Sequence, residues 1–171
     1  MNLHVREMLP SEAHLVISYF HDSTPEFLET MGVDPTRIPP AKVWQDRIEQ
    51  QYALPPERRA AVVVLWLMGD RPVGFSSCDK IVYGDRAFMH LHVLHPDKRQ
   101  SGIGAQCVRQ SAAIYFDMLK LKSLFCEPNA FNTGPNRTLQ KAGFKYLKTH
   151  MTVPGSLNYH QAVTRWLLAR P

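Results

Sequence analysis

The chain has 171 residues, of which 44% are hydrophobic and 20% charged, and its formal net charge is +5. This composition is typical of a folded globular protein, and the apolar stretches are too short for a membrane-spanning helix of about 20 residues. The segment Met1–Glu7 also lacks the charged and then apolar build of a signal peptide. We therefore expect one domain over residues 1–171, located in the cytoplasm and without a membrane partner.

Charge distribution and cysteine usage exclude further classes. A positive net charge favours anionic ligands in general, but the lysines and arginines are dispersed along the chain and form no contiguous stripe. This dispersal argues against a nucleic-acid partner. Cys78, Cys107 and Cys126 are odd in number and widely spaced, so we predict buried thiols and no disulfide framework.

The first half of the chain predicts a strand, then helices, then a run of strands. Ser11 is a candidate N-cap of the first helix, and Gly69-Asp70 and Gly84-Asp85 are turn signals between strands. The expected elements are a strand at 3–8, helices at 12–21, 26–31 and 41–52, and strands at 60–67, 73–82 and 87–94.

The second half alternates strands and helices. Residues 104–119 place apolar side chains along one side of a helix, Pro135 suits the first turn of a second helix, and Gly143 suits its C-terminal cap. Strands are expected at 123–127, 144–153 and 162–168. The order of elements predicts an α/β (α+β) domain whose central sheet is mixed, mostly antiparallel and flanked by helices, with at least one crossover.

The segment at 94–105 is the most informative part of the chain. A predicted strand leads into a basic loop with Lys98 and Arg99, and a helix follows from Gly-Ile-Gly-Ala at 102–105. Unpaired backbone N–H groups and the positive end of the helix would meet at this point. Glycine also lets a bulky anion approach the backbone closely. A pyrophosphate is the natural ligand of such a site.

Other interpretations of this segment fit less well. A P-loop requires Gly-x-x-x-x-Gly-Lys-Ser/Thr, which the chain lacks. A dinucleotide fingerprint requires Gly or Ala where Cys107 stands, and a tighter turn than residues 96–101 allow. Taken alone, this segment could also be a helix that begins after a loop with glycine and binds no ligand.

The segment resembles the GNAT superfamily of N-acetyltransferases. The family signature Gln/Arg-x-x-Gly-x-Gly/Ala is matched by Arg99, Gly102 and Gly104. A second block, Glu127-Pro128-x-x-x-Asn132 followed by Lys-Ala-Gly-Phe at 141–144, resembles the ribosomal-protein acetyltransferase branch. The resemblance covers residues 60–168 and implies the GNAT fold, in which two central strands splay apart.

The resemblance also implies acetyl-CoA as cosubstrate. The pantetheine arm would lie between the strands at 87–94 and 123–127, where one backbone N–H would polarise the thioester carbonyl. For Asn132, capping of the following helix is the alternative role. The residues that the resemblance places around the coenzyme are His92, Val93, Leu94, Arg99, Gln100, Ser101, Gly102, Ile103, Gly104, Ala105, Asn132 and Asn136.

Acetyl transfer of this kind needs a group that takes a proton from the amine, because an alkyl amine with a pKa of about 10 is mostly protonated at neutral pH. Many family members carry a glutamate on this strand, but residues 87–94 contain no acid. They contain His90 and His92, which alternate and therefore share a face. Arylalkylamine acetyltransferases resemble the chain here, and only His90 is in register with their histidines. We predict His90 as the catalytic proton acceptor and His92 as its support.

Other roles for these histidines are open. Each could simply pack within the sheet, and His90, His92 and His95 could together hold a metal ion. No cysteine or carboxylate lies beside them in sequence and the family needs no metal, so we predict none.

The proton donor to the leaving thiolate is not specified by the sequence. Leu139 stands where many family members carry a tyrosine for this purpose. Water, Tyr146 or Tyr159 would have to take its place.

The acceptor site of this fold usually lies between segments that correspond here to residues 22–40 and 154–160. Acidic side chains there could attract a cationic amine, or they could simply form a solvated face. Apolar side chains there could line a pocket, or they could simply pack in the core. These residues are Asp22, Glu26, Glu29 and Asp34, and Phe20, Phe27, Met31 and Trp44.

The sequence therefore predicts an acetyl-CoA-dependent N-acetyltransferase that acts on a primary amine of a small molecule or a protein. A catalytically weak acyl-CoA-binding module is the alternative, because both the strand glutamate and the helix tyrosine are missing. The acceptor, the acyl chain and the oligomeric state stay open, a homodimer among the choices.

Overall fold

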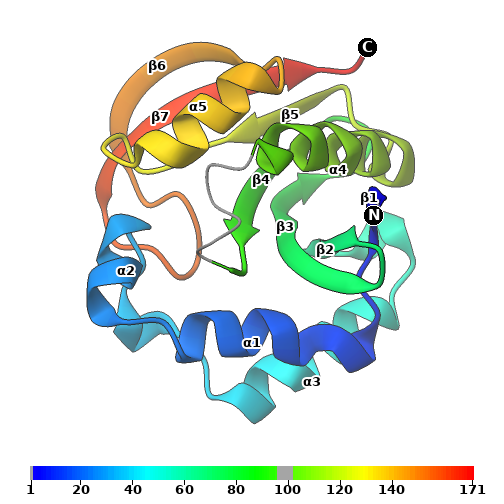
Figure 1. Ribbon diagram of the computed structural model, residues 1–171. Coiled ribbons are helices and arrows are strands. Elements are labelled where there is room, and N and C mark those ends of the chain that lie inside the picture. Colours follow the sequence, from blue (N-terminus) through cyan, green and yellow to red (C-terminus); the bar gives the residue numbers. More distant parts are fainter. Residues whose placement is uncertain (1, 96–101) are drawn as a thin grey trace.

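The computed structural model describes residues 2–95 and 102–171, and a seven-stranded sheet runs through it (Figure 1). The strands are β1 (Leu3–Glu7), β2 (Val62–Met68), β3 (Arg71–Val82), β4 (Arg86–Val93), β5 (Ser123–Cys126), β6 (Lys145–Thr152) and β7 (Gln161–Ala169). Their order is β1-β2-β3-β4-β5-β7-β6. Strands β4 and β5 are parallel and all other neighbours are antiparallel, which confirms the predicted mixed, mostly antiparallel sheet.

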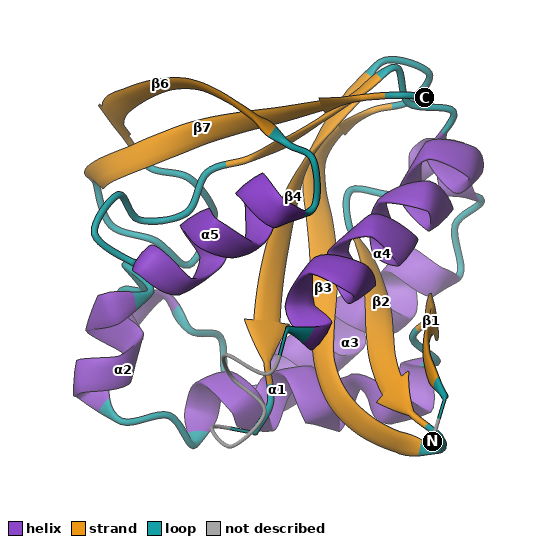
Figure 2. Ribbon diagram, turned by 45° about the horizontal axis from the view of Figure 1, so that its top comes forward, coloured by secondary structure: helices purple, strands orange, loops and turns teal. Residues whose placement is uncertain are grey.

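Helices cover both faces of this sheet. They are α1 (Ala13–His21), α2 (Pro25–Thr30), α3 (Ala41–Tyr52), α4 (Ile103–Leu119) and α5 (Thr133–Lys141), with short 3-10 helices η1 (Pro10–Glu12), η2 (Pro35–Arg37) and η3 (Pro56–Arg58). In Figure 2, α4 and α5 lie in front of the sheet, and α1 and α3 lie behind it.

Strand β2 shows how the sequence builds two cores on one sheet. Its side chains alternate, so that Val64 and Trp66 pack toward α4 while Val63 and Leu65 pack toward α1 and α3. Because both faces are buried, the strand is apolar throughout and does not alternate with polar residues. Burial of each such side chain contributes about 1.5–3 kcal/mol.

The predicted elements are present, with shifts at their ends. The prediction that Ser11 is the N-cap of α1 is wrong, because Glu12 occupies that position. Pro10 opens the 3-10 helix η1 instead, and the carboxylate of Glu12 accepts from Leu9 N–H at 2.8 Å. At the end of α5, Gly143 adopts a φ of 94° and confirms the predicted C-terminal cap.

Strands β4 and β5 separate partway along their length. Their ladder ends with the pair Met89 and Cys126, whereas the ladder between β4 and β3 continues to Val93. The last residues of β4 are therefore paired toward β3 beyond the point where β5 has ended. This arrangement confirms the splayed central strands.

The cysteines are buried as predicted. Cys78, Cys107 and Cys126 are free and buried, and burial raises the pKa of Cys107 to about 12. Within residues 2–95 and 102–171, no helix is long and apolar enough to cross a membrane.

Candidate active site

Helix α4 begins at Ile103, within the segment that the sequence singled out. Gly102 precedes the helix with a φ of 82°, a left-handed conformation that favours glycine. Gly104 faces α5, because a Cβ built on it would lie 3.2 Å from Thr138 Cγ2. The structure thus gives Gly104 a packing role besides the predicted ligand role. Arg99, Gln100 and Ser101 lie outside the described residues.

The two candidate asparagines near α5 differ in their surroundings. Asn132 occupies the N-cap position of α5, yet its side chain makes no capping hydrogen bond. Asn136 donates from Nδ2 to Asn129 O at 3.1 Å and to Asn132 O at 2.7 Å, and its Oδ1 accepts from Trp166 Nε1 at 2.9 Å. Any coenzyme contact through the Asn136 amide hydrogens would have to replace one of these bonds.

His90 contacts a carboxylate that the sequence analysis did not assign. Its Nε2 lies 3.1 Å from Oδ1 of Asp79, a residue of β3. The side chains of His90 and Asp79 are 23% and 29% exposed, so both are reachable from solvent. Gly155, in the loop between β6 and β7, also lies close to the ring, since a Cβ built on it would be 3.3 Å from His90 Cε1. An imidazole can accept and donate a proton, so this pair is a candidate for proton transfer.

His92 lies on the same face as His90 but in an apolar setting. Its ring stacks on Phe75 with centroids 4.7 Å apart and meets the edges of Tyr19 and Phe20. Its Nδ1 is buried without a hydrogen-bond partner among the described residues. Burial, and secondarily the nearby His90, lower the pKa of His92 to about 3. The ring is therefore neutral near pH 7, and its geometry favours packing over proton exchange.

A second polar group that the sequence analysis missed follows β5. Glu127 is buried, and its Oε1 accepts from Arg165 Nε and lies 3.4 Å from His150 Nε2. The Arg165 guanidinium also lies over the rings of Phe88 and Phe125. Glu127 entered the sequence analysis only as part of a motif. Its partner Arg165 lies far along the chain, and no local pattern links the two.

For Asp79, the sequence held no local signal. The turn at Gly84-Asp85 joins β3 and β4 as a hairpin, in which Val82 pairs with Arg86, and regular alternation from that pair would place Asp79 on the face opposite His90. The register shift between Asp79 and Val82 moves Asp79 onto the face of His90.

A groove of about 690 Å³ lies beside the end of β4. Its lining combines His14 of α1 and Asp22, which follows α1, with Phe27 of α2, and with Leu94 and His95 after β4. Of the predicted acceptor residues, Asp22 and Phe27 thus line a groove next to the candidate coenzyme strand. Arg71 also lines this groove, so its mainly apolar surface carries both a carboxylate and a guanidinium.

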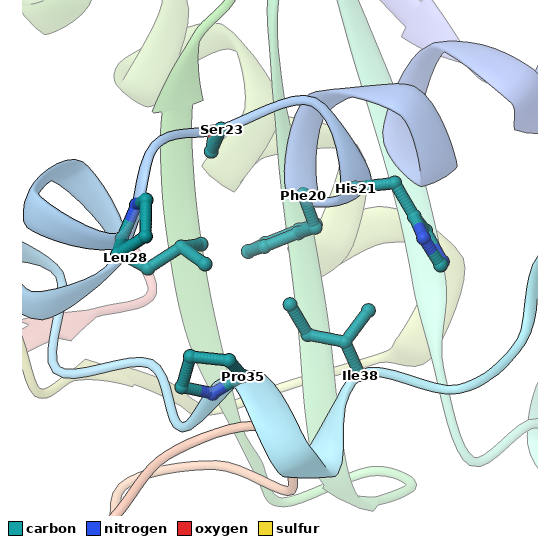
Figure 3. Close-up of a pocket in the computed structure, with 7 residues that line it drawn as sticks. Phe20, His21, Ser23, Leu28, Pro35 and Ile38 are labelled. Carbon is teal, nitrogen blue, oxygen red and sulfur yellow. The ribbon is translucent and has the colours of Figure 1, made fainter.

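A smaller cavity of about 300 Å³ lies behind the groove, between the end of α1, α2 and η2. Figure 3 shows Phe20, Leu28, Pro35 and Ile38 pointing toward one another around it. Phe20 also contacts the His92 ring at 5.2 Å between centroids, so Phe20 lies between this cavity and His92. Together with its burial in the core, this gives Phe20 a packing role, and Trp44 packs against it.

The two predicted acceptor segments are bonded to each other. Asp34 N–H donates to Leu157 O at 2.8 Å, and Asn158 Nδ2 and Gln161 Nε2 donate to Gly32 O at 2.9 and 2.8 Å. The polar groups here bind protein, and Asp34 itself accepts from Thr36. The groove at α1 is therefore a better candidate for acceptor entry than the junction of these segments.

The alternative metal site and the candidate proton donors can be located in the structure. Within the described part of the chain, no cluster of His, Cys, Asp and Glu suited to a metal ion is present. Leu139 is buried. The hydroxyl of Tyr146 is 2.9 Å from Thr149 Oγ1, and that of Tyr159 donates to Glu29 O at 3.3 Å, so both candidate tyrosines already have partners.

Most of the chain matches a known protein family. Residues 2–145 match the acetyltransferase (GNAT) domain family. The chain belongs to the GNAT acetyltransferase family. No curated protein matches the chain in sequence.

Solved structures support the GNAT fold at low sequence identity. RimL, a ribosomal L7/L12 alpha-N-protein acetyltransferase in complex with coenzyme A, is 14% identical with a TM-score of 0.76, and the match covers 99% of this chain and 94% of that one. Spermidine N-acetyltransferase from Vibrio cholerae, in complex with CoA and spermine, is 13% identical with a TM-score of 0.73, covering 98% and 95%. Aminoglycoside acetyltransferase AAC(6')-Ib with coenzyme A is 14% identical with a TM-score of 0.71, covering 99% and 95%.

Proposed function

We propose that this GNAT protein transfers an acetyl group from acetyl-CoA to a primary amine of a small molecule or a protein. The observation that carries the proposal is the early end of the β4–β5 ladder at Met89 and Cys126, while β4 runs on to Val93. Of the three predicted backbone contacts of the pantetheine amides, Leu94 already donates its N–H to Val73 O at 3.0 Å. Backbone groups alternate in direction along a strand, so Val93 is the expected contact on the side that faces away from β3. The start of α4, from Gly102, is the expected contact of the pyrophosphate.

The residues of this chain would supply orientation and proton transfer. Bound acetyl-CoA supplies an electrophilic thioester carbon, whose bond to sulfur breaks as the amine nitrogen bonds to that carbon. A backbone N–H at the end of β4 would stabilise the oxygen of that carbonyl. His90 would accept the proton that the amine loses, and the thiolate would take a proton from water. The protonated His90 then returns its proton to the hydroxide that is left. The net result is an amide, free coenzyme A thiol and one proton released from the ammonium substrate.

The acceptor would approach through the groove at α1. Asp22 offers a carboxylate to an ammonium group, while Phe27 and Leu94 offer apolar contact. This combination suits an amine on a partly apolar carrier. Asp22 supports a cationic acceptor as a class, whereas Arg71 on the same lining does not. The groove does not choose between a small molecule and a protein.

Two measurements on the intact protein test the proposal. Titration calorimetry with acetyl-CoA should give a single binding site. A thiol-release assay across a panel of amines should then give steady-state turnover with at least one cationic amine. Absence of coenzyme binding would overturn the proposal.

A catalytically weak acyl-CoA-binding module is the second candidate. It is favoured by the buried Leu139 in place of a tyrosine, and by the engagement of Glu127 with Arg165. Coenzyme binding without turnover on any amine of the panel would support this candidate instead.

A further inference from the structure

The Asp79–His90 pair is built from adjacent strands of the sheet. Ser77 lies opposite His90 in the β3–β4 ladder, and Asp79 lies diagonally from it on the same face. This geometry brings Asp79 Oδ1 to 3.1 Å from His90 Nε2. Asp79 is the last residue of the regular ladder before the register shifts, so the strand pairing places the two side chains next to each other.

A β-bulge follows directly after Asp79. The β3–β4 register shifts between Asp79 and Val82, and Lys80 adopts a φ of 48°, which is unusual for a residue with a side chain. Bulges of this kind turn a strand and re-aim side chains near functional sites. The bulge therefore sets the direction in which the strand leaves Asp79.

The bulge is secured by contacts outside its own strand. Lys80 Nζ donates to Pro154 O at 2.9 Å and lies 5.0 Å from the centroid of the Phe88 ring. Pro154 precedes Gly155, whose backbone approaches the His90 ring. The same loop between β6 and β7 thus contacts both the bulge and the imidazole, and strain in a left-handed residue persists only where surrounding contacts hold it.

The chemistry of the contact selects one form of the neutral imidazole. An ionised carboxylate only accepts hydrogen bonds, so Nε2 must carry the hydrogen when it faces Asp79. The other nitrogen, Nδ1, then holds the lone pair. When Nδ1 takes a proton, the resulting imidazolium carries its charge next to the carboxylate, which stabilises it.

We propose that Asp79 is a positioning residue that holds His90 as its Nε2–H tautomer, so that Nδ1 is the atom that accepts the proton of the amine. The proton passes from the amine nitrogen to Nδ1, the Nε2–H bond stays intact, and Asp79 remains ionised throughout. This inference rests on the proposed role of His90 in acetyl transfer.

A spectroscopic test does not depend on turnover. Nitrogen-15 NMR of histidine-labelled protein at a pH where the ring is neutral should show the Nε2–H tautomer for His90, assigned by its loss in His90→Gln. In Asp79→Asn, whose amide can donate or accept, a mixture of tautomers is expected, and Asp79→Glu should restore the single form. An Nδ1–H tautomer in the parent protein, or an unchanged tautomer in Asp79→Asn, would overturn the inference.

A kinetic cycle separates positioning from structural support. Asp79→Asn should lower kcat at least about tenfold with little change in the KM for acetyl-CoA. In the His90→Ala background the same substitution should cause no further loss. Equal losses in both backgrounds would mean that Asp79 acts independently of His90. Asp85→Asn is the matched control, because Asp85 pairs with Arg86 in the β3–β4 turn away from His90, and should leave kcat unchanged.

The two tests also distinguish this inference from the proposed function. If the parent protein turns over no amine, the proposed function fails while the tautomer measurement still reports on Asp79. If the parent is active and the kinetic cycle is additive, acetyl transfer stands and the role of Asp79 falls.

Discussion

Gly155 lies against the imidazole of His90, although the two residues belong to a loop and a strand far apart in the sequence. A Cβ built on Gly155 would lie 3.3 Å from His90 Cε1 and 2.7 Å from Asn158 Oδ1. Asn158 in turn donates to Gly32 O, so it is not free to move aside without losing that bond. The space beside His90 is therefore closed to any side chain at position 155.

This relationship predicts the effect of Gly155→Ala. The added methyl group should displace Asn158 or the His90 ring and lower kcat by up to about tenfold, because small misplacements of a reacting group are costly. Steady-state kinetics and circular dichroism would check the result. Gly84→Asn is the control, since nothing lies within 4 Å of a Cβ at that turn and asparagine tolerates its φ of 77°. Full activity of Gly155→Ala would show that the ring position is not critical.

His90→Ala should slow acetyl transfer by about 10²-fold or more at pH 7. The loss should be smaller at pH 9, where a larger share of an alkyl amine is already deprotonated and needs no acceptor. Rate measurements at saturating acetyl-CoA at both pH values test this. An equal loss at both would assign His90 a structural role.

Substitution at the start of α4 should weaken coenzyme binding. Gly104→Ala brings a methyl group to 3.2 Å from Thr138 Cγ2, so part of any effect would come from the contact between α4 and α5. The double variant Gly104→Ala/Thr138→Ala relieves that contact. Calorimetry should find acetyl-CoA binding weakened in both variants if the anion needs the bare backbone. Recovery in the double variant would reduce Gly104 to a packing residue.

His92 should make folding stability depend on pH. Its pKa is lowered to about 3 in the folded protein, so between about pH 6.5 and pH 3 the unfolded chain binds a proton that the folded one does not. The contribution of His92 to the free energy of unfolding is fully present above pH 6.5. Below that pH, the free energy of unfolding falls by about 1.4 kcal/mol per pH unit. Denaturant unfolding at several pH values should show a shallower decline for His92→Phe. Parallel pH profiles for the two proteins would contradict the depressed pKa.

Glu127→Ala should destabilise the fold through Arg165. Removal of a buried carboxylate leaves its cationic partner uncompensated, and the loss should reach at least about 2 kcal/mol. Urea unfolding measures this directly. Asp46→Ala provides the comparison, because Asp46 pairs with Lys42 on the exposed side of α3 and such pairs contribute little. Equal losses of unfolding free energy in the two variants would show that the Glu127–Arg165 pair stabilises the fold no more than an exposed pair does.

The element order and much of the site region were accessible from the sequence because they rest on local rules. A continuous apolar and β-branched run marked β2, and glycines marked the turns and the start of α4. Those signals operate within a few residues. The ends of elements were less predictable, as at Pro10, where a 3-10 turn and the Glu12 carboxylate replaced the expected serine cap.

The surroundings of the two histidines differ for reasons outside their own strand. His90 and His92 alternate on β4 and carry the same predicted chemistry, but Tyr19 and Phe20 of α1 enclose one ring while Asp79 faces the other. No periodicity in the strand distinguishes them. The packing of α1 against the sheet does.

By itself, the sequence predicted the mixed sheet and the helix start with its glycines, because hydrophobic period and turn chemistry are local properties of the chain, and its motifs resembled those of the GNAT family. Only the tertiary structure decided that Asp79 would face His90, that Arg165 would meet Glu127, and that the acceptor segments would bond to each other. Each of these contacts depends on strand register, a bulge or the docking of a helix, which arise when residues distant in the chain pack together.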